Sequence, residues 1–212
     1  MGLTKDSQKI YSCGNDGFLI TSHVETGQGR VGQVRLAHED SILKLSIQPE
    51  NNNIVLTASQ DYTIKLWDDR VEDSVGGSKE LFSFYLSLFL EMMTPGLMNN
   101  YVEFNPTQPN IFVSSNDRSA LYLWDLRTCF SSTSGLGKKD PLVRYATKLL
   151  KTNQKSIQIS KPVDITSAKF SPDGKMLCAN IQKYYPILYD LVDKDPIAIL
   201  KDPSFSSLAT IK

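Results

Sequence analysis

The sequence predicts an all-β protein built from repeated antiparallel hairpins, and three observations support this fold class. Short runs alternate between apolar and polar side chains, which is the pattern of strands with one buried face. Polar turns rich in Asn, Asp and Gly separate these runs. One strand–turn–strand unit recurs along the chain, with Ser22, Trp67 and Trp124 at equivalent places 45 and 57 residues apart.

The clearest unit spans residues 54–70, with the sequence IVLTASQDYTIKLWDDR. Residues 54–59 alternate as a strand does, and residues 60–62 form a polar break of the length that a tight turn uses. Residues 63–67 then resume the alternation. We therefore expect a hairpin that ends at Trp67.

The unit before it is atypical. Residues 10–27 align with the same hairpin and place Asp16 where Asp61 falls, but Ser22 replaces the Trp. Residues 31–37 follow as the expected outer strand. There is no room upstream for a full first strand, so we expect the chain to begin inside a unit.

The outer strand of the clearest unit is ambiguous. Its first strand is expected at residues 42–47, just after His38, but residues 71–79 are polar and Gly-rich. Residues 81–93 read LFSFYLSLFLEMM and fit either an outer strand or a short helix. Residues 77–98 differ in character from the rest of the chain. They are either a real insertion or retained non-coding sequence in the gene model, and the sequence leaves both open.

Two further units are more regular. Their strands are expected at residues 101–104, 111–115, 120–125 and 142–146, and then at 165–170, 176–181, 185–191 and 196–200. Tyr189 and Asp190 stand in the last unit where Trp124 and Asp125 stand in the one before. The Lys-rich stretch 148–161 between the two units is expected to be an exposed loop.

These units resemble WD40 repeats. The resemblance implies a β-propeller whose blades are four-stranded antiparallel sheets. Such propellers usually carry seven blades and about four are visible here, so we expect a single incomplete propeller that is part of a longer protein. The expected divisions are a blade at 8–37, a blade at 38–98 with an irregular insertion near 77–98, a blade at 99–147, a loop at 148–161, a blade at 162–201 and the start of another at 205–212.

The resemblance also implies a buried polar network in each regular blade. In WD40 repeats a Trp, a Ser or Thr, a His and an Asp form it. The matching positions are His38, Ser59 (or else Thr57), Asp61 and Trp67, and Trp124 takes the Trp place in the next blade. A Ser, a His and an Asp could also serve a hydrolase. The propeller gives all of them a structural role and no oxyanion loop is visible, so we expect no catalytic residues.

Two successive units end in the boxes WDDR and WDLR, which place Asp68 with Arg70 and Asp125 with Arg127. These boxes resemble the WDXR box of the substrate receptors of cullin-4 RING ubiquitin ligases. The resemblance implies a non-catalytic scaffold of the nucleus or cytoplasm that binds the ligase adaptor and a substrate protein. An Arg just past the strand presents a planar fork that suits carboxylates and backbone carbonyls.

An alternative remains open for the same residues. A basic residue often follows Trp-Asp in WD40 repeats that dock nothing, and Arg70 could simply pair with Asp68 or Asp69. The chain would then be a general WD40 scaffold in a chromatin, RNA-processing or ribosome-biogenesis complex.

Composition excludes several classes of function. The 212 residues carry 23 basic and 23 acidic side chains, so no net charge draws the chain to nucleic acid or to an acidic membrane. The three cysteines are scattered without a CxxC pair, which argues against a zinc site. The longest apolar run, residues 81–90, is too short to span a bilayer. We expect no metal, no cofactor and no small-molecule substrate.

Overall fold

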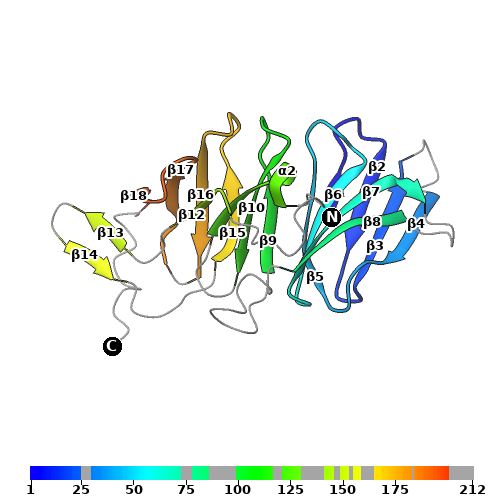
Figure 1. The fold of residues 1–212 in the computed structure, drawn as a ribbon, viewed down its shortest axis with the longest axis horizontal. Coiled ribbons are helices and arrows are strands. Elements are labelled where there is room, and N and C mark those ends of the chain that lie inside the picture. The colour runs from blue at the N-terminus through cyan, green and yellow to red at the C-terminus, as the bar shows by residue number, and fades with distance from the viewer. Residues whose placement is uncertain are drawn as a thin grey trace.

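The computed structural model is built almost wholly of strands (Figure 1). It describes residues 1–24, 30–72, 78–85, 99–116, 121–129, 141–145, 149–152, 155–158, 165–182 and 184–200. Within these residues the strands form four antiparallel sheets of four strands each, and one separate hairpin. The predicted fold class, an all-β partial propeller of four-stranded blades, is confirmed.

Each sheet uses four strands that follow one another along the chain. The first sheet contains β1 (Gly2–Leu3), β2 (Lys9–Cys13), β3 (Phe18–His23) and β4 (Arg30–Leu36). The second contains β5 (Ile42–Ile47), β6 (Ile54–Ser59), β7 (Thr63–Glu72) and β8 (Ser78–Tyr85). The third contains β9 (Asn99–Phe104), β10 (Ile111–Asn116), β11 (Leu121–Asp125) and β12 (Val143–Tyr145), and the fourth β15 (Ile165–Phe170), β16 (Met176–Ile181), β17 (Ile187–Asp190) and β18 (Pro196–Ile199).

The four sheets share one strand register. In the second, third and fourth sheets the Trp or Tyr of the third strand lies opposite an apolar residue of the second strand. The pairs are Val55 with Trp67, Phe112 with Trp124 and Leu177 with Tyr189. In the first sheet Ser22 takes this place, opposite Ile10.

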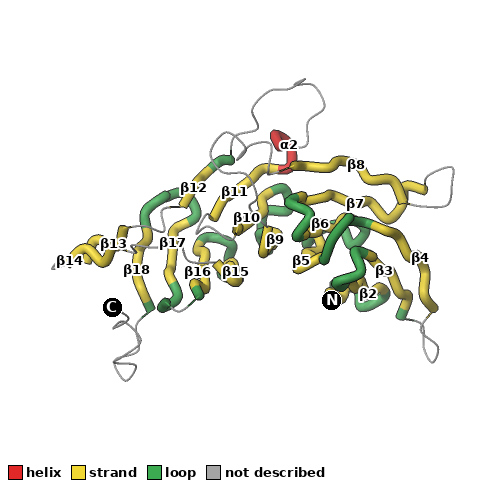
Figure 2. Tube along the Cα trace, turned by 90° about the horizontal axis from the view of Figure 1, so that it is seen from below, coloured by secondary structure: helices red, strands yellow, loops and turns green. Residues whose placement is uncertain are grey.

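The sheets follow one another along an arc (Figure 2). Strands β5, β9 and β15 lie on its concave side, and β4, β8 and β12 lie on its convex side (Figure 2). This is the arrangement of propeller blades, in which the first strand of each blade faces the axis.

Apolar side chains fill the spaces between neighbouring sheets. Tyr11 and Leu19 of the first sheet share a buried cluster with Trp67 of the second. Leu56 and Ile64, on the opposite face of the second sheet, pack with residues of the third sheet that include Trp124. Tyr189 of the fourth sheet is buried in a cluster with residues of the third. The face on which each Trp or Tyr lies therefore packs against the preceding blade.

Two glycines bring adjacent sheets together at their turns. Gly17 has a φ of +74°, and a Cβ there would come within 2.4 Å of the His38 carbonyl oxygen. Gly174 has a φ of +70°, and its carbonyl accepts a hydrogen bond from the Asn105 side chain at 2.9 Å. Any larger residue would be strained at either position, and it would collide with His38 from Gly17 or with Asn105 and Thr107 from Gly174.

Three parts of the structure refine or correct the sequence-based expectations. A two-residue strand, β1, pairs with β2, so the first sheet has a short version of the strand for which the sequence left no full room. Strand β8 pairs with β7, which agrees with the outer-strand interpretation of residues 81–85. Residues 86–98, which carry the rest of the irregular segment, lie outside the described residues, as do residues 205–212.

The stretch predicted as an exposed loop at 148–161 instead contains a hairpin. Strands β13 (Leu149–Thr152) and β14 (Lys155–Gln158) pair with each other, and Leu150 lies opposite Ile157. The lysines of this stretch led to the loop prediction. Lysine is common on exposed edge strands as well, so its presence does not exclude a strand. Among the described helices, none is long and apolar enough to cross a membrane.

Candidate functional site

The polar network of the second blade joins buried side chains. The His38 ring reaches Asp61 through Nδ1 at 2.8 Å and Thr57 Oγ1 through Nε2 at 2.6 Å. The indole Nε1 of Trp67 donates to the same Thr57 oxygen at 2.9 Å. Thr63 joins the network: its hydroxyl donates to the Asp61 carboxylate at 2.6 Å, and the hydroxyl oxygen lies 3.0 Å from His38 Nδ1.

Thr57, and not Ser59, is thus the hydroxyl between the His and the Trp. The Ser59 hydroxyl donates to the Asp40 carbonyl at 3.1 Å and accepts the Asp61 backbone N–H at 3.1 Å, so it holds the turn. Both residues face the same side of β6, which is why the sequence pattern left the choice open. Thr57 lies closer to Trp67 across the hairpin, since Val55 is the residue directly opposite the Trp.

The geometry gives this network a structural role and leaves it unsuited to hydrolysis. Thr57 and His38 are buried, and the Thr57 hydroxyl already contacts both the imidazole and the indole N–H. Burial alone would raise the pKa of Asp61, but hydrogen bonds from His38 and Thr63 lower it below its ordinary value of 3.8. The ionised Asp61 therefore fixes the imidazole inside the blade.

The third blade repeats part of this network. The indole N–H of Trp124 donates to Ser114 Oγ at 2.9 Å, in the place that Thr57 holds for Trp67. The Trp124 ring also stacks on Phe112. The sequence prediction named Trp124 but not Ser114. The strand alternation could have found it, because Ser114 lies two residues after the partner of the Trp.

The two WDXR boxes adopt the same local geometry. Arg70 forms a two-pronged pair with Asp68, with Nε at 2.9 Å and Nη2 at 2.6 Å from its two carboxylate oxygens. Arg127 forms the same pair with Asp125, at 3.0 and 2.6 Å. In each box the Asp also accepts the backbone N–H of the Arg, at 3.0 and 2.9 Å.

The Asp and the Arg of each pair differ in how much of the side chain is exposed. The Asp68 and Asp125 side chains are almost enclosed, whereas the Arg70 and Arg127 side chains are 59% and 71% exposed. The hydrogen bond from each guanidinium is the main reason why the pKa of its Asp is lowered. Each Asp is thus an anchor that holds an exposed planar cation in a fixed orientation.

The residue between Asp and Arg points inward in both boxes. Asp69 forms ion pairs with Lys9 at 3.0 Å and with Arg35 at 2.7 Å, both in the first sheet. Leu126, its counterpart, packs against the apolar cluster between the second and third sheets. The backbone N–H of Asp69 donates to the Asn53 carbonyl at 2.9 Å, and that of Leu126 donates to the Asn110 carbonyl at 2.8 Å. These contacts tie each box to the turn between the first two strands of its own sheet.

The boxes leave the strand ladder at equivalent points. In the second sheet, residues 68–71, which include the last three residues of the box, lie in a bulge of β7 between the pairs Trp67 with Glu80 and Glu72 with Ser78. In the third sheet the chain turns after Asp125 into the short helix α2 (Leu126–Cys129). Both boxes therefore project at the same end of adjacent sheets. Asp68 and Asp125 have the same register in their hairpins, opposite Ile54 and Ile111, and we call the end of the sheets where they lie with Arg70 and Arg127 the rim.

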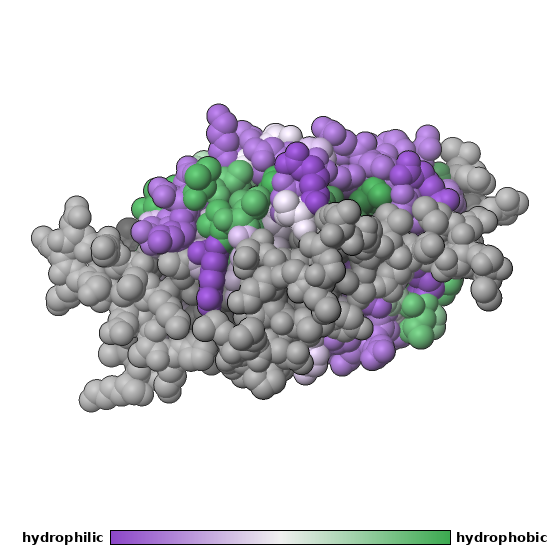
Figure 3. All heavy atoms as spheres, viewed as in Figure 1, coloured by the Kyte–Doolittle hydropathy of each residue, from purple (hydrophilic) through white to green (hydrophobic). Residues whose placement is uncertain are grey.

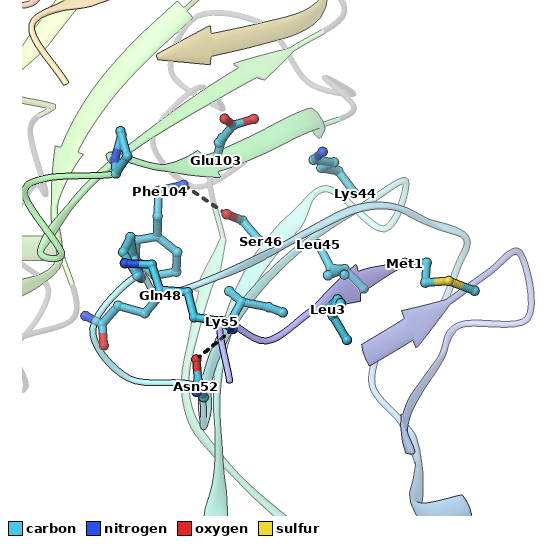
Figure 4. A pocket seen from close by; sticks show the side chains of 14 residues that line it. Met1, Leu3, Lys5, Lys44, Leu45, Ser46, Gln48, Asn52, Glu103 and Phe104 are labelled. Carbon is cyan, nitrogen blue, oxygen red and sulfur yellow. Dashed lines mark hydrogen bonds between the residues drawn. The ribbon is translucent and has the colours of Figure 1, made fainter. Parts of the chain in front are cut away.

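A groove of about 380 Å³ lies between the N-terminal residues and strands β5 and β9. Figure 4 shows Leu3, Lys5, Gln48 and Phe104 around it, with the Phe104 N–H bonded to Ser46 Oγ. Its charged lining residues are Lys5, Lys44 and Glu103, and no His, Cys or Asp lines it. In the described part of the chain, no group of three or more His, Cys, Asp or Glu could hold a metal ion.

Comparisons with known proteins agree with this architecture. Residues 30–68 match the WD40 family, described as WD domain, G-beta repeat. Over all 212 residues the chain is 27% identical to the DDB1- and CUL4-associated factor 5 of Homo sapiens and to that of Mus musculus. A stretch of 78 residues, 37% of the chain, is 31% identical to the WD-40 repeat-containing protein MSI4 of Arabidopsis thaliana and covers 15% of it. The chain spans 19% of the length of the two associated factors.

Proposed function

We propose that this chain, a partial WD40 propeller, is the part of a cullin-4 RING ligase substrate receptor that docks on the ligase adaptor. Its function is protein binding, with no reaction of its own. The observation that carries the proposal is the shared geometry of the two boxes. Each presents an exposed Arg fork, oriented by a nearly buried Asp, on the same rim of adjacent blades.

The fourth blade supports a binding role for the two arginines. Its equivalent segment reads Tyr189, Asp190, Leu191 and Val192, so it has no Arg. Asp190 still accepts the backbone N–H of Val192 at 3.0 Å, as Asp68 and Asp125 do for their arginines. The turn therefore forms without an Arg. The guanidinium groups of Arg70 and Arg127 are available for a partner.

The chemistry of the fork fits a protein partner. A guanidinium held by one carboxylate keeps further N–H donors for carboxylates or carbonyls of a docked surface. An ion pair whose Arg is mostly exposed contributes little to folding, whereas an Arg that becomes buried at an interface is often essential for binding. The printed names of the relatives associate those proteins with DDB1 and CUL4, which agrees with the proposed partner.

A co-purification experiment on the full-length protein tests the proposal. We expect the double variant Arg70→Ala/Arg127→Ala to lose the cullin-4 adaptor while its melting temperature stays unchanged. A matched control, Arg144→Ala/Lys169→Ala, removes two exposed positive charges on the outer strand β12 and the inner strand β15 and should keep the adaptor. Adaptor binding by the arginine variant with an unchanged melt would reject the proposal and favour the general-scaffold alternative.

A further inference from the structure

We infer that the docking rim extends to the fourth blade, where Val192 makes an apolar contact with the same partner that Arg70 and Arg127 bind. This inference rests on the proposed function. It assigns the partner a chemistry: oxygen acceptors opposite two consecutive blades and an apolar group opposite the third.

Val192 occupies the place of the box arginines, as two hydrogen bonds indicate. Its backbone N–H donates to Asp190 Oδ1 at 3.0 Å, against 3.0 Å for Arg70 and 2.9 Å for Arg127 with their own aspartates. The preceding Leu191 N–H donates to the Lys175 carbonyl at 2.9 Å. The corresponding bonds of Asp69 and Leu126 are 2.9 and 2.8 Å long. All three segments are thus hydrogen-bonded through the backbone to the turn between the first two strands of their sheet.

Val192 is unusually exposed for an apolar residue. Its side chain is 80% accessible, more than that of any other large apolar residue in the described part of the chain except Met1. Met176, which is partly exposed, lies on the neighbouring strand opposite Asp190. Figure 3 shows hydrophobic atoms gathered over the region of β16 and β17, beside hydrophilic atoms. A single exposed Val would be ordinary, but this one stands at the third position of a repeated rim.

A Val in place of an Arg fits a partner surface that combines charged and apolar groups. Val192 is followed by Asp193, Lys194 and Asp195, so acidic and basic groups are balanced around it. A partner that brings carboxylates to Arg70 and Arg127 would gain nothing from a further acidic group there. An apolar group would instead be removed from water together with Val192. Burial of a Val typically changes affinity about tenfold.

Affinity measurements on the full-length protein with the purified adaptor test the inference. We expect Val192→Asp to weaken binding about tenfold, Val192→Ile to keep it, and Val192→Arg to weaken it as well. All three should leave the melting temperature unchanged, because the side chain is exposed. The matched control is Ile197→Asp, at an exposed apolar position on the outer strand β18 of the same sheet, which should bind normally.

The outcomes separate this inference from the proposed function. Unchanged binding by Val192→Asp, while Arg70→Ala/Arg127→Ala loses the adaptor, would overturn the inference and leave the proposed function standing. Stronger binding by Val192→Arg would also overturn it, since the partner would then offer an acceptor at the third blade. Full adaptor binding by the double arginine variant would reject the proposed function, and the inference with it.

Discussion

Thr57 and Ser59 differ in role because of their individual contacts. Both hydroxyls lie on the same face of β6, and a period-two pattern cannot separate them. The structure separates them by their distance from the Trp: Thr57 receives the indole N–H and Ser59 holds the turn. The sequence could therefore predict Trp67, His38 and Asp61 by position, but the fourth member depended on packing.

Thr57→Val should be clearly more destabilising than Ser59→Ala. The first change removes the acceptor of a buried indole N–H and a partner of a buried imidazole, which should cost about 1–3 kcal/mol of unfolding free energy. The Ser59 hydroxyl instead serves backbone groups of the turn. Denaturant unfolding of both variants measures the difference. Equal losses, or a larger loss for Ser59→Ala, would contradict the assigned network.

Asp61 should make the stability of the protein sensitive to acid. Its pKa is lowered on folding, so its contribution to stability is complete above the ordinary value of 3.8 and is lost as the pH falls below it. The wild-type protein should therefore lose more stability between about pH 4 and pH 2 than Asp61→Asn does. Urea midpoints measured across this range test the sign. A larger loss of stability at low pH in Asp61→Asn than in the wild-type protein would contradict the prediction.

At the scale of elements, each box consists of one inward residue between a Trp-Asp pair and an outward Arg. The inward residue is an ion-paired Asp69 in one box and an apolar Leu126 in the next. The repeated WDXR pattern could be predicted from sequence. The role of its variable position could not, because Asp69 pairs with Lys9 and Arg35, which come from another sheet.

Asp69→Ala should be strongly destabilising, whereas Arg70→Ala should not change the melting temperature. Asp69 and Arg35 are both nearly enclosed, and removal of one partner from a buried pair typically costs about 3–5 kcal/mol. The Arg70 side chain is mostly exposed, and the fourth blade forms the same turn without an Arg. Thermal and urea unfolding of the two variants provide the comparison. A large loss of stability in Arg70→Ala would mean that Arg70 has a structural role.

The strands that were predicted well from the sequence are those that pair with a neighbouring strand on both edges. The inner strands are rich in apolar residues because both of their faces are buried between neighbouring blades, as in β6 and β10. Outer strands have one partner and less burial, so their patterns are weaker. The sequence left strand β8 as one of two interpretations, and it wrongly predicted the β13–β14 hairpin as a loop.

At the scale of the whole molecule, the arc leaves one face of the first sheet without a neighbouring sheet among the described residues (Figure 2). Phe18 and Ile20 lie on this face, opposite Leu36 and Val34 of β4. Val34 and Leu36 are 57% and 68% exposed. In a longer propeller, such a face is the one that packs against a further blade.

The chain of 212 residues alone should therefore bind a hydrophobic dye or self-associate. We expect Val34→Lys/Leu36→Lys to reduce both effects, because it places charges on the exposed face without disturbing the buried clusters. Dye fluorescence and light scattering measure the two effects. A monodisperse wild-type chain that binds no dye would contradict this expectation.

The central claim is that the two boxes together dock one partner, and a titration of adaptor binding tests it most directly. The full-length wild-type protein, Arg70→Ala, Arg127→Ala and the double variant would be titrated with the purified adaptor, each beside a thermal melt. We predict that each single change weakens binding about thirtyfold and that the double change abolishes it, with all melting temperatures equal. Wild-type affinity in the double variant, at an unchanged melting temperature, would contradict the account.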